Sequence, residues 1–222
     1  MLQNAEPKAG TKLPATDIYG ITAEEHSLGR DNIDVVKQMI DAGIRIIQYR
    51  EKEKDMGEKY EQCLKIREMT QKAGVFFIVN DHVDIAMLVK ADGVHIGQED
   101  LPLPAVRELV GHRMVIGVST HNPMQAKTAV EQGADYIGVG PIYRTHTKKN
   151  VCDPVGFGYL DHVVSHYPEM DFVAIGGIKA HNIRDVVQHG ATRICLVTEI
   201  VGAGDIGMKI KEIRSRIQGE TQ

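Results

Sequence analysis

The sequence has few cysteines, and none of them are paired at a metal-binding or redox spacing. The three cysteines, Cys63, Cys152 and Cys195, lie far apart and their number is odd. This argues against a disulfide-stabilised domain and favours free thiols in a reducing compartment. The polar start of the chain, residues 1–14, lacks the apolar segment of a secretory signal. We therefore expect a cytoplasmic protein.

Long hydrophobic runs and an excess of basic residues are also missing. No apolar stretch approaches the roughly 20 residues that cross a bilayer. The net charge is -4, and lysine and arginine are scattered along the chain. We therefore expect neither a membrane nor a nucleic acid as partner. What remains, 42% hydrophobic and 25% charged residues in 222, is typical of a globular protein with its own core.

Short apolar runs alternate with longer amphipathic segments along the whole chain. Runs rich in Ile, Val, Tyr or Phe predict strands at 18–21, 44–49, 75–79, 93–96, 114–118, 136–139, 172–175 and 193–197. Between them, helices are predicted at 31–42, 56–73, 82–89, 104–110, 123–132, 159–166, 182–189 and 205–217. Asp31 and Asn122 stand where caps of two of these helices belong.

Eight such strand–helix units in a chain of this length predict a (β/α)₈ TIM barrel. An open doubly wound sheet is the alternative, but no glycine-rich GxGxxG turn follows the first predicted strand. No linker or low-complexity block interrupts the pattern. We expect a flexible N-terminal tail over residues 1–15 and a single barrel domain over residues 16–222.

The loops after the barrel strands carry function in this fold, so polar residues at these exits are the candidates. Behind the second strand, strand alternation places Gln48, Arg50 and Lys52 on one side and Tyr49 on the other. If the first set faces the barrel mouth, its guanidinium and ammonium groups suit a phosphate or diphosphate. A solvated surface loop is the alternative.

Acidic residues follow the third and fourth strands, which should be neighbours. Asp81 comes after Asn80, and Asp100 ends the segment QED. Two carboxylates beside a diphosphate are a usual Mg²⁺ arrangement. Each aspartate could instead cap the helix that follows it. A zinc site is not expected at His82 and His95, because no HxxxH or cysteine partner is in range.

Further candidates follow the last four strands. Ser119 is free to bond a ligand because Asn122 already looks like the cap, and a hydroxyl satisfied by the backbone is the alternative. The loop 140–150 offers hydroxyls and lysines for an anion, at Thr145, Thr147 and Lys148, and a charged surface loop is the alternative. Gly177 and Thr198 stand at the last two exits, which often bind phosphate through backbone N–H groups. The two anion sites suggest two phosphorylated substrates, and no activated nucleophile is evident.

The exit motifs together resemble those of the thiamine phosphate synthase family. They are QYREK at 48–52, VNDHVDIA at 79–86, DGVHIGQED at 92–100, GVSTH at 117–121, GPIYRTHTKK at 140–149 and AIGGI at 174–178. The motifs run in family order across nearly the whole chain. The resemblance implies a Mg²⁺-dependent TIM barrel that joins a pyrimidine diphosphate to a thiazole phosphate. The products would be thiamine phosphate and pyrophosphate, formed by a dissociative route.

The resemblance also implies a role for each candidate residue. The pyrimidine diphosphate would be held by Gln48, Arg50, Lys52, Asn80, Ser119 and Lys148. Of these, Arg50, Lys52, Ser119 and Lys148 would act in catalysis. Mg²⁺ would be held by Asp81 and Asp100. The thiazole phosphate would be held by Thr145, Thr147, Gly177, Val197 and Thr198.

Three other functions remain open at this point. A thiazole tautomerase-like relative would use no diphosphate, and such proteins tend to lose the acids and the TxTKK loop that are present here. A non-catalytic phosphate-binding barrel would not need both a metal and a loop lysine. A phosphosugar isomerase would want an acid–base pair at facing exits, and the first strand supplies no clear acid. The sequence leaves a homo-oligomer possible.

Overall fold

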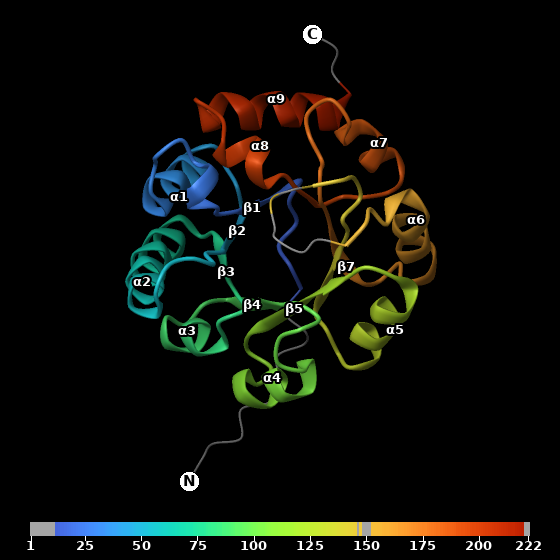
Figure 1. Cartoon of the computed structure of the whole chain (residues 1–222), viewed down its shortest axis with the longest axis horizontal. Helices are drawn as coiled ribbons and strands as arrows, with labels where there is room; N and C mark the ends of the chain where they lie inside the picture. Colours follow the sequence, from blue (N-terminus) through green and yellow to red (C-terminus); the bar gives the residue numbers. More distant parts are fainter. Residues whose placement is uncertain (1–11, 146, 148–151, 220–222) are drawn as a thin grey trace.

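The computed structural model describes residues 12–145, 147 and 152–219. Eight parallel strands form a closed barrel in sequence order, from β1 to β8, with β8 paired to β1. Figure 1 shows the helices arranged around this barrel. The predicted (β/α)₈ barrel is confirmed, and the open sheet is excluded.

The strands are short, as expected for runs buried on both faces. They are β1 (Ile18–Ile21), β2 (Ile46–Tyr49), β3 (Phe76–Asn80), β4 (Gly93–Ile96), β5 (Val115–Thr120), β6 (Tyr136–Val139), β7 (Asp171–Ile175) and β8 (Ile194–Cys195). The helices are η1 (Glu24–His26), α1 (Asn32–Asp41), α2 (Met56–Ala73), α3 (Val83–Leu88), α4 (Leu103–Val110), α5 (Pro123–Glu131), α6 (Gly156–His166), α7 (Ile183–Gln188), α8 (Val197–Val201) and α9 (Ile206–Gln218). None of these described helices is long and apolar enough to cross a membrane.

Most predicted boundaries agree within a few residues, and two caps are confirmed. Asp31 accepts a hydrogen bond from the N–H of Asp34, and Asn122 accepts one from the N–H of Gln125, at 2.8 and 3.0 Å. The prediction at the last strand was wrong at its end. β8 stops at Cys195, and Val197 begins the short helix α8 instead. A β-branched residue in an apolar run looks like strand, but here the chain turns at the barrel mouth.

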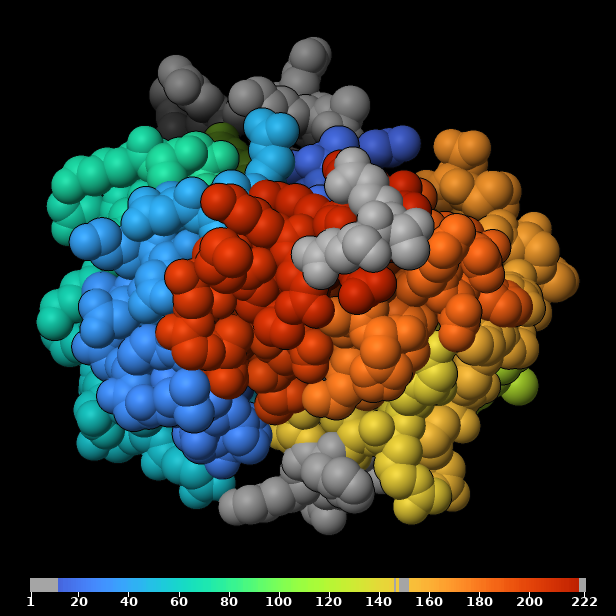
Figure 2. Space-filling view, turned by 90° about the horizontal axis from the view of Figure 1, so that it is seen from above, coloured from blue at the N-terminus to red at the C-terminus, as the bar shows by residue number. Residues whose placement is uncertain are grey.

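The core has two layers. The larger one lies between the outward strand faces and the helices, and a smaller one fills the barrel. The C-terminal helix α9 packs against α1, α7 and α8, and Figure 2 shows it between α1 and α7 on the outside of the molecule. The core is therefore continuous around the barrel, and the strand ends are free to carry polar groups.

The end of the barrel at which the strands begin, opposite the mouth, is closed by the segment before β1. Leu13 is 3% exposed and packs with the residues inside the barrel. Its N–H donates to Asp171 at 3.1 Å, and Arg193 pairs with the same carboxylate at 3.0 Å. The barrel core thus includes Leu13, which the sequence analysis placed in the tail. Residues 1–11 of that tail lie outside the described residues.

We expect Leu13→Ala to destabilise the protein by about 2–4 kcal/mol, because it removes buried methyl groups from the base of the barrel. Urea unfolding followed by circular dichroism measures this change. Leu109→Ala is the matched control, since Leu109 is 55% exposed on α4. A loss no larger than that of the control would show that this segment does not close the barrel.

Candidate active site

Arg50 lies at the end of β2 with its side chain toward the barrel interior. It is 8% exposed, and its Nε has no hydrogen-bond partner within the described part of the chain. The hydroxyl of the buried Thr22 accepts a hydrogen bond from the N–H of Arg50 at 2.9 Å and donates one to its carbonyl. A buried cation with an open donor is costly unless an anion completes it. The site is therefore built to receive negative charge.

Asp81 and Asp100 meet, as predicted from the adjacency of their strands. The two carboxyl groups interact directly, and Asp81 also forms an ion pair with Lys52. Burial raises the pKa of the Asp100 carboxyl, and the neighbouring charge of Asp81 adds to this, against a hydrogen bond from the N–H of Gly97. Facing carboxylates that repel each other gain stability when a divalent cation lies between them.

The capping alternative for these two aspartates was wrong. The N-cap position of α3 is occupied by His82 and that of α4 by Pro102. Neither helix has a side chain that accepts a hydrogen bond from its first N–H groups. Asp81 instead adopts a left-handed backbone conformation, with φ of 62°. Its N–H donates to the carbonyl of His95 at 2.8 Å. This unusual backbone, held by the adjacent strand, turns the carboxylate toward Asp100.

These two carboxylates fit Mg²⁺, because hard oxygen donors in a set of one or two, completed by water and phosphate, are its usual protein ligands. Among the described residues no group of three or more histidine, cysteine or acidic side chains could hold a metal ion. A metal here would therefore take its remaining ligands from substrate and water.

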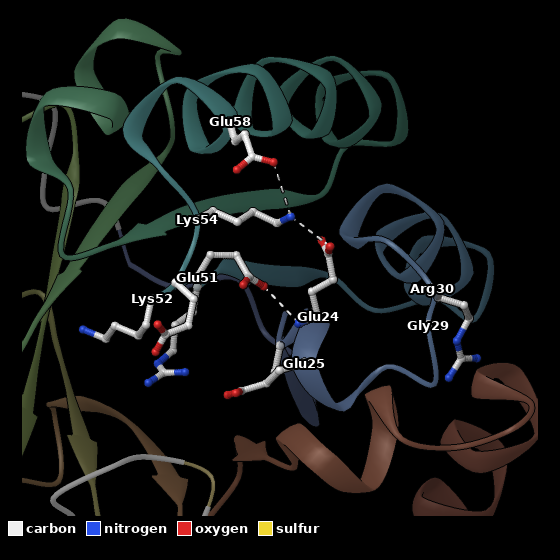
Figure 3. Close-up of a pocket in the computed structure, with 11 residues that line it drawn as sticks. Glu24, Glu25, Gly29, Arg30, Glu51, Lys52, Lys54 and Glu58 are labelled. Carbon is white, nitrogen blue, oxygen red and sulfur yellow. Dashed lines mark hydrogen bonds and ion pairs between the residues drawn. The ribbon is translucent and has the colours of Figure 1, made fainter.

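A pocket of about 380 Å³ opens beside the ends of β1 and β2, and Arg50 and Lys52 line it. Figure 3 shows its far wall, where Lys54 bridges Glu24 and Glu58, at 2.9 and 3.9 Å. This lysine is neutralised by its carboxylates, whereas Lys52 points away from them in Figure 3 and pairs with Asp81 instead. Among the described residues, Arg50 is therefore the one of these three cations for which no ion pair is present, and Lys52 can serve a ligand that competes with Asp81.

The polar residues of the middle strands lie inside the mouth. Asn80 is buried at the end of β3, and Gln48 is buried in β2. Ser119, in β5, is hydrogen-bonded through Oγ to Nε2 of His95 at 2.9 Å. The side chains of Gln48 and Arg50 are both buried, and that of Gln48 points into the barrel, as expected. Tyr49 faces outward and donates to Gln62.

The remaining candidates come together on the other side of the mouth. Thr145 and Thr147 bond to each other through their hydroxyl groups at 3.1 Å. Gly177 has φ of 64°, and a Cβ there would lie 2.6 Å from the carbonyl oxygen of Arg144. Only glycine therefore lets the loop after β7 pack against the loop after β6. Lys148 lies outside the described residues.

Val197 and Thr198 form the first turn of α8, next to the loop after β7. Glu199 connects the two segments: it pairs with Lys179 and accepts a hydrogen bond from the N–H of Ala180, both at 3.3 Å. The structure thus brings the candidates that it describes into two groups, one at the exits of β2 to β5 and one at the exits of β6 to β8.

Sequence reasoning missed two buried tyrosines. Tyr19 and Tyr136 stand inside the barrel, where they read as ordinary hydrophobic core, yet their hydroxyl groups are 2.8 Å apart. Tyr136 also contacts Nδ1 of His95 at 2.9 Å. Strand alternation puts both tyrosines on the same face as Gln48 and Ser119, and this was the available signal.

A family model described as thiamine monophosphate synthase matches residues 18–200. The chain belongs to the thiamine monophosphate synthase family. A thiamine-phosphate synthase of Pelotomaculum thermopropionicum is 65% identical over 201 residues, 90% of this chain and 92% of that protein. Another, of Lawsonia intracellularis, is 57% identical over 94% of this chain and 95% of that protein.

A solved structure agrees. The thiamine phosphate pyrophosphorylase of Pyrococcus furiosus superposes with a TM-score of 0.83 at 30% identity, over 93% of this chain and 97% of that one. The family, the fold and the transferase activity predicted from the sequence, thiamine phosphate synthesis, are confirmed. The tautomerase-like, non-catalytic and isomerase interpretations lose their basis.

Proposed function

We propose that the mouth of this barrel binds a pyrimidine diphosphate and a thiazole phosphate and joins them with release of pyrophosphate. The observation that carries the proposal is Arg50, a buried guanidinium with an unpartnered Nε among the described residues, beside the Lys52–Asp81–Asp100 cluster. This group of charges suits a diphosphate that leaves with two negative charges or more. A homo-oligomeric state and a cytoplasmic location stay predictions.

The side chains at the first group of exits, together with Lys148 from the segment after β6, stabilise the leaving group. The bond between the pyrimidine methylene carbon and the diphosphate oxygen breaks, and the electron pair departs with pyrophosphate. Arg50, Lys52 and Lys148 stabilise the negative charge that grows on the pyrophosphate. Preorganised donors of this kind lower the barrier. Mg²⁺ on Asp81 and Asp100, when bound, would neutralise a further part of the pyrophosphate charge.

The rest of the site holds the two rings. Gln48, Asn80 and Ser119 orient the pyrimidine cation. The thiazole phosphate is held by Thr145, Thr147, Gly177, Val197 and Thr198. This places the thiazole nitrogen so that its lone pair forms the new carbon–nitrogen bond. Positioning of this kind replaces the nucleophile or acid–base pair that other transferases need.

The test is an assay with purified protein, both substrates and Mg²⁺. We expect release of pyrophosphate and formation of thiamine phosphate in equal amounts, and loss of both on addition of EDTA. Pyrophosphate release without the coupled product would contradict the transfer step. Turnover that persists in EDTA would contradict the metal assignment and leave the transfer intact.

We expect Lys148→Ala to lower kcat by about 10-fold or more, as loss of one charged group that contacts the leaving anion does. Lys149→Ala is the matched control, because it removes the same charge from the next position. Steady-state kinetics with saturating thiazole phosphate measures both variants. Equal losses in the two would show that the loop acts only through its total charge.

A further inference from the structure

A continuous chain of hydrogen bonds crosses the barrel interior below the mouth. Nε2 of Gln48 donates to the hydroxyl of Tyr19 at 2.9 Å, and this hydroxyl contacts that of Tyr136 at 2.8 Å. The chain continues from Tyr136 to Nδ1 of His95, and from Nε2 of His95 to Oγ of Ser119, each at 2.9 Å. It joins Gln48, on β2, to Ser119, on β5.

The sequence makes room for this chain. A Cβ at Gly117 would lie 2.0 Å from Cζ of Tyr136, so any other residue would push the ring out of the barrel interior. TIM barrels usually fill this space with branched apolar side chains. Here Gly117, on β5, has no side chain, and the ring of Tyr136 occupies the space that a side chain would fill. This layer therefore carries polar, hydrogen-bonded groups where apolar side chains would usually pack.

Counting protons gives the chain one direction. Burial raises the pKa of both tyrosines, so each keeps a single hydroxyl proton to donate. Tyr19 accepts from Gln48, and we infer that its single proton goes to Tyr136, the other hydroxyl within hydrogen-bond distance. Tyr136 then donates to Nδ1 of His95. A neutral imidazole that accepts at Nδ1 carries its proton on Nε2, and in this direction it donates that proton to Ser119.

We propose that Tyr19 and Tyr136 are positioning residues: Tyr19 fixes the amide orientation of Gln48 directly, and Tyr136, through His95, makes Ser119 a hydrogen-bond donor to the substrate. The Ser119 oxygen accepts from His95, and so its own proton is kept for the ligand. This inference rests on the proposed function in assigning that ligand as the pyrimidine. If Ser119 donates, the site favours a pyrimidine that presents a hydrogen-bond acceptor to Ser119. A pyrimidine analogue that presents a donor at this position would bind poorly.

The direction of the chain can be tested without substrate. In protein with ¹⁵N-labelled histidine at pH 8, where an ordinary histidine is neutral, we expect His95 to carry its proton on Nε2. The signal is assigned by its loss in His95→Gln. In Tyr136→Phe, which removes the donor to Nδ1, this single tautomer should give way to a mixture. A proton on Nδ1 in the unaltered protein, or no change in the variant, would overturn the inference.

Kinetics then test the effect on the site. We expect Tyr19→Phe and Tyr136→Phe to lower kcat/KM for the pyrimidine diphosphate by about 10-fold each, because a buried donor or acceptor is left unpaired. KM for the thiazole phosphate should change by less than about twofold in both variants. A role in stability alone would not produce this division between the two substrates.

Tyr159→Phe is the matched control. Tyr159 is also buried and donates one hydrogen bond, to Thr120 at 2.6 Å, but it lies outside the chain. It should leave both kinetic parameters unchanged. If Tyr19→Phe behaves like Tyr159→Phe, the positioning role is excluded. If the unaltered protein forms no thiamine phosphate, the proposed function fails. The tautomer of His95 still tests the direction of the hydrogen-bond series, because that measurement needs no substrate.

Discussion

Arg50→Met is expected to lower kcat/KM for the pyrimidine diphosphate by about 10²–10³-fold, the usual cost of losing one preorganised donor to a developing anion. Methionine keeps most of the buried volume and removes the charge and all donors. The guanidinium contributes most where charge develops, because its surroundings exclude water and strengthen the interaction. We expect the main loss in kcat, measured as initial rates of pyrophosphate release.

The same variant should be as stable as the unaltered protein, or more stable. Nε of Arg50 lacks a partner within the described residues, so its burial is a cost that folding alone does not repay. Residues of this kind trade stability for function. A midpoint of urea unfolding at or above that of the unaltered protein, together with the loss of rate, would identify Arg50 as an anion-binding group.

Arg45→Met is the matched control for this prediction. Arg45 directly precedes β2 and is exposed. Its replacement by methionine removes the same charge as Arg50→Met, but at the opposite end of the strand. It should leave both rate and stability nearly unchanged. If Arg50→Met unfolds the protein instead, Arg50 has a structural role, and the charge at the mouth must come from Lys52 and Lys148.

The parts of this site that depend on local rules could be predicted from the sequence. Buried parallel strands appear as short apolar runs, and this is why the barrel could be predicted. The period of two in a strand placed Gln48 and Arg50 on one face. The adjacency of consecutive strands predicted that Asp81 and Asp100 meet. Each of these inferences needs only neighbouring residues or neighbouring strands.

The parts that depend on distant partners could not be predicted. Tyr19 and Tyr136 are separated by 117 positions, and inside apolar strands nothing distinguishes them from core. Gly117 reads as a weak strand residue until the ring that occupies its missing side chain is known. The ion pair between Lys52 and Asp81 was also missed, because each residue was assigned its own ligand. In the proposed complex the diphosphate would bind Lys52 and Mg²⁺ would bind Asp81, and this would separate the pair.

That separation makes Asp81→Asn the second variant with a large expected effect. Asparagine tolerates the left-handed backbone at this position, where φ is 62°, better than alanine does, so the variant removes charge and little else. We expect kcat/KM to fall by about 100-fold or more at a fixed Mg²⁺ concentration, since an amide is a weaker ligand for a hard cation than a carboxylate.

Two further results would distinguish loss of a metal ligand from loss of a surface charge. Raising the Mg²⁺ concentration should restore part of the activity of Asp81→Asn, because its defect lies in metal affinity. Asp84→Asn, which removes an exposed carboxylate three positions along the chain, should leave the Mg²⁺ dependence unchanged. If Asp81→Asn needs no more Mg²⁺ than the unaltered protein, Asp81 serves only to hold Lys52. The metal would then have to be bound by Asp100 and the diphosphate alone.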